Sequence, residues 1–272
     1  MFLSDYHLHS CFSFDCSQTI EEIAREAAQK QLREIAVTDH AELAAGASAA
    51  YLADLSEAAQ AIDRAAQRWS GRLTIRKGVE LGNAHLAPQA ADEIARGFSG
   101  DFIIGSVHNI QPEQDVAYCD YTKTDPDKML RAYFDAVKTV AETADYDVLG
   151  HLTYPLKAIF EQTGTVPDLR RYTAQLESIF TIVAARGKGI EVNTSGLRCR
   201  LGKLLPDAPL LRLYRQCGGR CVTVGSDAHR PQDVGAGICE AAERLKECGF
   251  AEITTFEKRR PIPRPIETSG TA

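Results

Sequence analysis

The chain has 272 residues, 44% of them apolar, which is enough for one large core. Its 31 basic and 37 acidic residues give a net charge of −6, which argues against a general nucleic-acid binder and favours small substrates. No apolar run approaches the roughly 20 residues of a membrane helix. The first residues lack the basic and apolar regions of a targeting peptide, so we expect a cytoplasmic protein without a membrane segment.

The eight cysteines are scattered and include no C-x-x-C motif, so the sequence favours reduced thiols over a disulfide framework. Cys11 and Cys16 lie near the first histidines and are alternative metal ligands. Soft thiolates would be redundant beside so many imidazole and carboxylate groups. We therefore favour a role outside the metal site for both.

Strand and helix patterns alternate along the chain. Thr19 is a typical helix cap, with Glu21 and Glu22 in the first turn behind it, and residues 48–69 carry apolar side chains at helical spacing. The predicted strands are 2–7, 34–38, 73–81, 101–107, 146–150, 189–193 and 221–225. The predicted helices are 19–31, 48–69, 88–96, 125–143, 169–186, 209–217 and 237–248.

This alternation predicts parallel strands joined by right-handed crossovers. About seven strand–helix units favour a barrel over an open sheet, so we expect an α/β fold, a TIM-like (β/α)7 barrel, as a single domain over residues 1–272. A tail bearing proline and arginine begins at Glu257. We interpret its cations as part of a solvated terminal segment; they are Lys258, Arg259, Arg260 and Arg264.

Six of the seven histidines and three acids stand where predicted strands end. The carboxyl ends of barrel strands meet at one mouth, which is where such folds carry their chemistry. Residues two apart in an extended segment project to the same side, so His7 and His9 can hold one ion together. A lone histidine is more often structural, but six at successive strand ends indicate a metal site. Its candidate ligands are His7, His9, Asp15, His40, Glu80, His108, His151, Asp227 and His229.

The types of ligand restrict the metal. Imidazole mixed with carboxylate suits zinc, manganese or iron rather than magnesium or calcium. A catalytic zinc has three protein ligands and an open position. Nine candidates are too many for one ion, so we expect a cluster of two or three divalent metals with one carboxylate bridging a pair. The remaining histidine, His85, has no assigned role.

The ordered motifs H-x-H, T-D-H, G-x-E, S-V-H, G-H and S-D-A-H, which end at His9, His40, Glu80, His108, His151 and His229, resemble the PHP superfamily, named for polymerase and histidinol phosphatase. The resemblance covers nearly the whole chain and implies a distorted (β/α)7 barrel holding two or three metals. It implies one metal on His7, His9, Glu80 and Asp227, a second on Glu80, His108 and His151, and a third on Asp15, His40 and His229. Many members have histidine at the position of Asp15, where carboxylate also serves these metals.

The stretch I-E-V-N-T-S-G-L-R at 190–198 and the compact length are similar to the branch of monofunctional histidinol-phosphate phosphatases. In that branch an arginine after N-T-S-G is similar to a ligand of the substrate phosphate, which makes Arg198 the candidate here, with Lys157 as a second positive charge. The alternative for Arg198 is a surface arginine in the cationic loop 198–203. We expect a small phosphate monoester as substrate and a monomer or weak homo-oligomer.

Hydrolysis of phosphate monoesters requires enhancements of up to about 10²¹, whereas one general base supplies roughly 10²–10⁴. We therefore expect a hydroxide that bridges two metals to attack phosphorus while Arg198 holds the other oxygens. A proton for the leaving alkoxide would come from the neighbourhood of Asp227 or His229. The substrate ammonium has three candidate partners, among which the sequence does not choose: Glu113, Asp115 and Asp233.

Two alternatives stay open. One is a phosphoesterase of the same superfamily that acts on nucleotides or other small phosphate monoesters, or that trims nucleic-acid 3′ ends; the pI near 5.7 argues against long polyanions. The other is a metal-binding barrel without activity, although every expected ligand position holds a competent residue.

Overall fold

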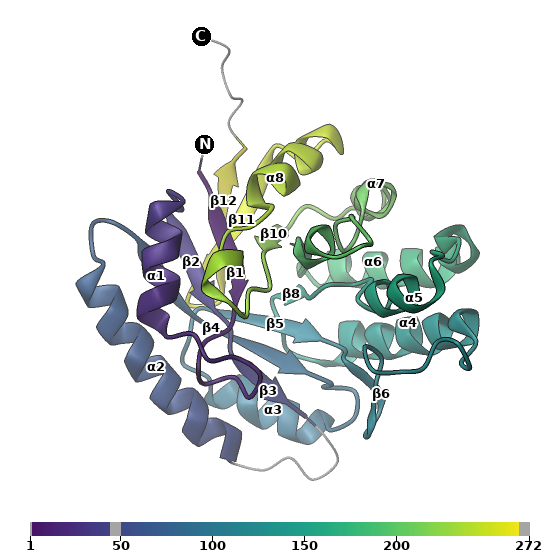
Figure 1. Ribbon diagram of the computed structural model, residues 1–272, viewed down its shortest axis with the longest axis horizontal. Coiled ribbons are helices and arrows are strands. Elements are labelled where there is room, and N and C mark those ends of the chain that lie inside the picture. Colours follow the sequence, from purple (N-terminus) through teal and green to yellow (C-terminus); the bar gives the residue numbers. More distant parts are fainter. Residues whose placement is uncertain (1, 44–49, 267–272) are drawn as a thin grey trace.

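The computed structural model describes residues 2–43 and 50–266, and the side chains of residues 50–54 lie outside this description. Seven parallel strands form a sheet that curves almost into a closed barrel (Figure 1). Their order around the sheet is β1 (Ser4–Leu8), β2 (Glu34–Val37), β4 (Thr74–Gly82), β5 (Phe102–Ser106), β8 (Val148–Leu149), β9 (Gly189–Asn193) and β10 (Val222–Gly225). A short strand, β3 (His40–Glu42), follows β2 and pairs with the end of β4.

The last strand of the barrel, β10, ends beside the first, β1. Leu8 and Ala228 form a parallel bridge, and the amide of Asp227 donates to the carbonyl of His7 at 2.8 Å. This contact brings the first and last strand ends side by side. The predicted TIM-like (β/α)7 barrel is confirmed.

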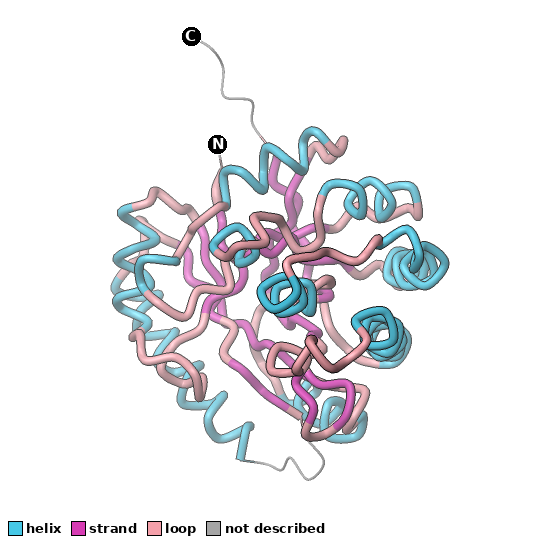
Figure 2. Tube along the Cα trace, turned by 45° about the vertical axis from the view of Figure 1, so that its right-hand side comes forward, coloured by secondary structure: helices cyan, strands magenta, loops and turns pink. Residues whose placement is uncertain are grey.

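Eight α-helices lie around the outside of the strands in the described part of the chain (Figures 1 and 2). Thr19 caps the first of them through a reciprocal capping box with Glu22, as its position in the sequence predicted. The helices are α1 (Ile20–Gln29), α2 (Ala50–Arg68), α3 (Pro88–Gly97), α4 (Pro126–Thr143), α5 (Pro155–Thr163), α6 (Thr173–Ala185), α7 (Ala208–Gln216) and α8 (Ile238–Glu247).

Some helix predictions need correction. The predicted helix at 169–186 is a short 3₁₀ turn, Leu169–Tyr172, followed by α6, and residues 48 and 49 of the predicted helix 48–69 lie outside the described residues. Helix α5 was not predicted. It has only nine residues, and its apolar face consists of Pro155, Leu156 and Ile159, so its periodic signal is weak.

Two β-hairpins were also not predicted. The first joins β6 (Asn109–Gln111) to β7 (Gln114–Asp115), directly after β5. The second joins β11 (Glu252–Glu257) to β12 (Arg260–Pro265). Its two turn residues, Lys258 and Arg259, both have positive φ, a conformation usually supplied by Asn-Gly or Asp-Gly. The sequence therefore carries no ordinary turn signal there.

The interpretation of the tail as a solvated segment is wrong for part of it. Lys258 and Arg260 are exposed, but Arg259 forms ion pairs with Asp145 and Asp147, and Arg264 lies 3.5 Å from Glu34. Phe256 of the second hairpin is buried in a cluster with residues of four barrel strands. The hairpin therefore closes the end of the barrel at which the strands begin.

The barrel strands are buried on both faces apart from the first residues of β4, as expected for parallel strands covered by helices. Among the described residues, every helix is too short or too polar to span a bilayer. All eight cysteines are unpaired, as the sequence predicted.

Candidate metal centre

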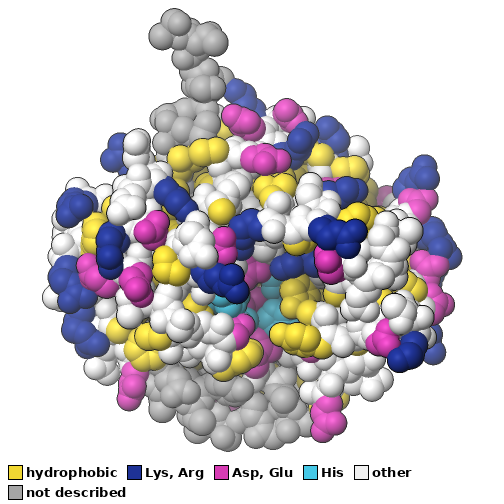
Figure 3. Space-filling view, in the orientation of Figure 1, with side chains coloured by type: hydrophobic (Ala, Val, Ile, Leu, Met, Phe, Trp, Pro, Cys, Tyr) yellow, Lys and Arg dark blue, Asp and Glu magenta, His cyan; other side chains and the backbone are white. Residues whose placement is uncertain are grey.

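A cavity of about 640 Å³ opens where the strands end, with histidine side chains on its floor (Figure 3). His7 and His9 are fully buried beneath it. The other seven candidate ligands line the cavity: Asp15, His40, Glu80, His108, His151, Asp227 and His229. The structure therefore brings all nine residues singled out in the sequence to one place, from the ends of six strands and the loop after β1.

The first predicted group consists of His7, His9, Glu80 and Asp227. One oxygen of Glu80, Oε2, lies 3.2 Å from His7 Nε2 and 3.5 Å from His9 Nε2. Asp227 Oδ1 lies 3.6 Å from His9 Nε2 and 3.9 Å from His7 Nε2. Two donors on one tetrahedral zinc, each about 2.0–2.1 Å from it, are about 3.3 Å apart. These spacings are those of atoms that share an ion.

The second predicted group uses the other oxygen of the same carboxylate. Glu80 Oε1 lies 3.0 Å from His151 Nε2 and 3.3 Å from His108 Nε2, and the two ring nitrogens are 3.1 Å apart. Glu80 also approaches His40, with 3.0 Å between Oε2 and Nδ1. A carboxylate whose two oxygens face two sets of imidazoles is suited to bridge two ions.

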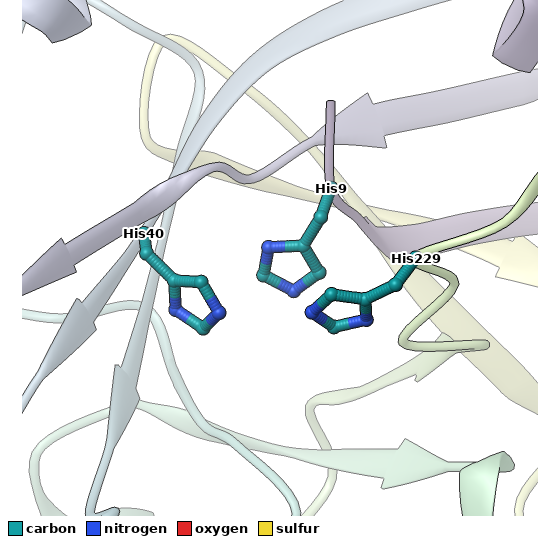
Figure 4. A group of neighbouring side chains, drawn as sticks. All are labelled: His9, His40 and His229. Atoms are coloured by element: carbon teal, nitrogen blue, oxygen red, sulfur yellow. The ribbon is translucent and has the colours of Figure 1, made fainter. Parts of the chain in front are cut away.

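The third predicted group lies toward the mouth. Asp15 Oδ2 lies 3.1 Å from His229 Nε2 and 3.5 Å from His40 Nε2. Figure 4 shows His40 and His229 converging with His9, and the three offer ring nitrogens within 4.8 Å of one another. His9 thus lies between the first and third groups, which the sequence did not suggest.

Orphaned nitrogen atoms test whether this cluster fits metals. His7 Nε2 and His9 Nε2 are buried and have no hydrogen-bond partner, which is rare for buried polar atoms. Their other ring nitrogens do have partners: Glu191 at 2.7 Å from His7 Nδ1, and the Ser13 hydroxyl at 3.1 Å from His9 Nδ1. A ring held at one nitrogen and free at the other is the usual state of a metal-binding histidine. The residues present fit divalent metals.

Two carboxylates that hold these rings were missed in the sequence. Glu191 is buried in β9, where it contacts His7 and accepts the amide of His151 at 2.7 Å. Glu42 lies 2.7 Å from His108 Nδ1. A signal was present for Glu191, because a carboxylate inside a buried apolar strand needs a partner. Glu42 stands two residues after His40, which places it on the same side of the short strand β3.

Buried aspartates also fix the loops that carry the ligands. Asp5 accepts the amide and hydroxyl of Ser226, at 2.8 and 2.5 Å, just before Asp227. Asp39 accepts the amide of Ser10 at 2.6 Å, just after His9. Burial raises the pKa of both Asp5 and Asp39. Their role is to position backbone, since their oxygens accept hydrogen bonds from the amides and hydroxyls of these loops.

The electrostatics of the cluster favour cations. Burial raises the pKa of Glu80, but the surrounding histidines, His7 first among them, outweigh it and hold that pKa well below its usual range. Burial lowers the pKa of His7, but nearby carboxylates, Glu191 first, raise it well above the usual value. Burial and the neighbouring His40 lower the pKa of His9 to about 3. Ionised carboxylates thus attract protons to the rings, and metal ions would displace those protons.

Basic side chains lie beside the cluster in the same cavity. Arg198 is about one-quarter exposed and donates to the carbonyl of Asp227 at 3.2 Å, while Lys157 Nζ donates to the Ser195 hydroxyl at 3.0 Å. Arg230, which the sequence did not single out, lines the cavity as well. The three cations lie in the segments that follow β8, β9 and β10, with Lys157 in helix α5, so they approach the cluster from neighbouring strands.

Other residues considered in the sequence lie elsewhere. Cys11 is exposed, and the thiol of Cys16 donates to the backbone carbonyls of His9 and His229 at 3.2 and 3.4 Å. His85 is half-buried and does not line the cavity.

Residues 5–195 match the family model of the PHP domain, which is well over half of the chain. The chain belongs to the PHP domain family. The match contains seven of the nine candidate ligands, and Asp227 and His229 lie beyond it, just after the strand that closes the barrel. The resemblance inferred from the motifs is therefore confirmed.

Proteins of this PHP family similar to the chain include a "Probable histidinol-phosphatase" of Thermotoga maritima, 27% identical over 94% of this chain and 96% of the relative. A "Histidinol-phosphatase" of Lactococcus lactis subsp. lactis is 27% identical over 93% of both chains. The crystal structure of histidinol phosphate phosphatase from Lactococcus lactis, complexed with zinc, L-histidinol and phosphate, superposes with a TM-score of 0.80 at 24% identity, covering 96% of this chain and 98% of the other. This likeness supports the distorted barrel seen here.

Proposed function

We propose that this PHP protein is a metal-dependent phosphatase that hydrolyses L-histidinol phosphate to L-histidinol and phosphate in histidine biosynthesis. The observation that carries the proposal is one cavity in which a histidine–carboxylate cluster adjoins three basic side chains. Relatives named histidinol-phosphatase match along nearly the whole chain, and the solved relative binds zinc, L-histidinol and phosphate. The free cysteines agree with a cytoplasmic location for the reaction.

The cofactors of the proposed reaction are two or three divalent ions, which we take to be zinc, manganese or iron. Glu80 has the position of the bridging carboxylate, because its two oxygens face different imidazoles. Bound here, the metals would supply an activated water and neutralise charge on the phosphoryl group. The proposed ligands are His7, His9, Asp15, His40, Glu80, His108, His151, Asp227 and His229.

The phosphate would bind on the side of the basic loops. Lys157 is held by the Ser195 hydroxyl and Arg198 by the carbonyl of Asp227, so both cations are positioned by the ends of β9 and β10. Arg198 can offer two parallel N–H donors to phosphate oxygens, which a lysine cannot. We assign the phosphate to Arg198 first, with Lys157 adding positive charge. Both side chains are part of the proposed substrate site.

The leaving alkoxide needs a proton as the P–O bond breaks. Asp227 and His229 both line the cavity, and His229 is about 30% exposed. We propose that the proton reaches the alkoxide from the neighbourhood of these two residues.

The test is phosphate release by protein purified without chelator, with bound metals counted in the same sample. L-Histidinol phosphate is compared with nucleoside monophosphates and an aryl phosphate at matched concentrations. We expect a strong preference for L-histidinol phosphate, with two or three metals per chain. Equal or faster turnover of the nucleotides would overturn the proposed substrate and leave the metal centre standing.

A further inference from the structure

Two aromatic rings at the mouth of the cavity lie almost entirely in solvent. Phe14 is 79% exposed and Tyr118 is 88% exposed, and they are the two large hydrophobic side chains with high exposure among the described residues. Both line the cavity that contains the metal cluster. Single exposed hydrophobic residues are common. Two that line one functional opening indicate a surface kept for a ligand.

Both rings belong to loops that contact proposed metal ligands. Phe14 precedes Asp15 and stacks on His40, with ring centroids 5.1 Å apart and planes at 28°. Tyr118 follows the β6–β7 hairpin, which begins directly after His108. The amide of Val116 donates to the carbonyl of His108 at 2.9 Å, which ties the hairpin to that ligand. The aromatic surface therefore has a defined position relative to the cluster.

Asp115, an acidic residue of the β6–β7 hairpin, has no basic side chain as an ion-pair partner among the described residues. It lines the cavity, is half-buried, and lies opposite Asn109 in the β6–β7 pairing. Its Oδ1 accepts the amide of Ala117 at 2.7 Å, and no lysine or arginine of the described chain forms an ion pair with it. A half-buried carboxylate with spare acceptor capacity beside a cavity is suited to a positively charged group.

The other two acids that the sequence left open do not share these properties. Asp233 lines the cavity but lies 3.5 Å from Arg198 Nε, so its charge already has a partner. Glu113 is exposed and does not line the cavity. Of the three acids, only Asp115 combines a place in the cavity with an unpaired charge.

The cavity is thus divided by charge. Lys157, Arg198 and Arg230 come from the segments after β8, β9 and β10, and Asp115 and Tyr118 come from the segment after β5. In Figure 3, basic side chains lie along the upper edge of the hollow and hydrophobic ones along its lower right edge. A molecule with a phosphate at one end and an ammonium group and ring at the other matches this division.

We propose that Asp115 binds the ammonium group of the substrate and that Phe14 and Tyr118 form the surface against which its imidazole ring lies. The inference deepens the proposed function and rests on it. The ammonium donates hydrogen bonds to Asp115 Oδ2, the oxygen with no hydrogen-bond partner among the described residues. These residues select an amino-bearing phosphate ester and take no part in breaking the P–O bond.

The experiment compares substrates with and without the amine in two matched pairs. One pair is L-histidinol phosphate and its deaminated analogue, 3-(imidazolyl)propyl phosphate; the other is phosphoethanolamine and ethyl phosphate. Asp115→Asn should lower kcat/KM by roughly 10–100-fold for the amine-bearing member of each pair. It should change the amine-free member little. Glu113→Gln, on the same hairpin but outside the cavity, is the matched control and should behave as the wild type.

Tyr118→Ser tests the aromatic surface separately. It should lower the preference for L-histidinol phosphate over phosphoethanolamine by roughly 3–10-fold, because it removes a ring contact and leaves the ammonium site. Metal content should stay at the wild-type level in both variants. An unchanged preference in Tyr118→Ser would overturn the aromatic part of the proposal.

The outcomes separate the two proposals. Equal losses on amine-bearing and amine-free esters in Asp115→Asn would mean a structural role and overturn the assignment, as would no loss at all. A wild-type protein that discriminates against neither amine-free ester would also overturn it. A wild type that prefers amine-bearing esters but gains nothing from the imidazole would refute L-histidinol phosphate as substrate while leaving Asp115 as the ammonium site.

Discussion

Buried carboxylates at the two ends of the barrel have different partners. Where the strands begin, Glu34 is 2% exposed and lies 2.9 Å from Arg76 Nε, and Asp147 is 4% exposed and pairs with Arg259. Where the strands end, Glu80 is 1% exposed and faces imidazole nitrogens of five histidines. The buried acids at one end pair with arginines, and the buried acid at the other end faces histidines.

The partners of these buried carboxylates distinguish the acids that stabilise the fold from the acid that belongs to the functional site. A buried charge is tolerated when it is paired and hydrogen-bonded. At the closed end, the pairing is complete within the protein, so those acids hold the hairpin β11–β12 in place. At the open end, histidines compete for protons beside carboxylates, and four of their buried ring nitrogens have no hydrogen-bond partner among the described residues. Such a cluster is completed by ions from outside.

Removing the metals should have the largest effect, because it takes away all the ions that complete the cluster at the open end. Dialysis against a strong chelator should abolish phosphate release and lower Tm, and added zinc or manganese should restore both. Ligands that bind only the folded state stabilise it by about 4 kcal/mol at a thousand times their Kd. The measurement is turnover and thermal unfolding of the same sample before and after metal is returned. Full activity in protein shown to be free of metal would contradict the proposal.

Glu80→Gln should come next, since it removes the charge of the carboxylate that both metal groups share. We expect a loss in kcat/KM greater than the roughly 10–100-fold typical of residues that merely orient a metal ligand. Circular dichroism should be unchanged, and metal analysis should give fewer ions per chain. Glu34→Gln is the matched control at the other end, where we expect lower stability and wild-type kcat. Wild-type activity in Glu80→Gln would remove this carboxylate from the mechanism.

Glu191→Gln should have an intermediate effect, because Glu191 holds His7 and the backbone of His151 without facing the cavity. A loss of about 10–100-fold in metal affinity or activity is typical for such an outer carboxylate. Excess metal should recover part of the activity, which separates this variant from Glu80→Gln. A titration of activity against free zinc gives the comparison. If the two variants had the same zinc dependence, Glu191 would be acting as a direct ligand.

The sequence predicted the barrel and gathered the right side chains because both depend on local pattern. Strand–helix alternation gives the topology, and strand ends in such a barrel share one mouth. Glu42 and Glu191 were not singled out, because their partners, His108 and His7, are 66 and 184 residues away in the chain. Asp115 was one of three equal candidates until the structure paired Asp233 with Arg198.

The closed end was harder to predict for a related reason. The hairpin β11–β12 is read as a polar tail because its turn is Lys258-Arg259 and its second strand alternates with proline. Its stability comes from contacts with distant parts of the chain, such as Phe256 with Tyr6 and Arg259 with Asp147. No window of local sequence contains that information.

The smallest effect in this series should come from Arg259→Met, which breaks the pairing at the closed end. Asp147 keeps the amide of Ile103 at 2.8 Å, and Arg259 is 21% exposed, so water can replace part of the lost contact. We therefore expect a destabilisation of about 1–3 kcal/mol rather than the 3–5 kcal/mol of a fully buried pair. Urea unfolding measures it, and kcat for the substrate should not change.

Arg170→Gln is the control for that variant, because it removes an ion pair of similar geometry from the surface. Arg170 is 89% exposed and lies 2.8 Å from Asp168, which is itself 47% exposed. Exposed pairs contribute about 0–1 kcal/mol, so this variant should unfold almost as the wild type does. If Arg259→Met were equally mild, the carboxylates of the closed end would be hydrated well enough without their cations. The contrast between the two ends would then rest on the unpartnered ring nitrogens of the open end alone.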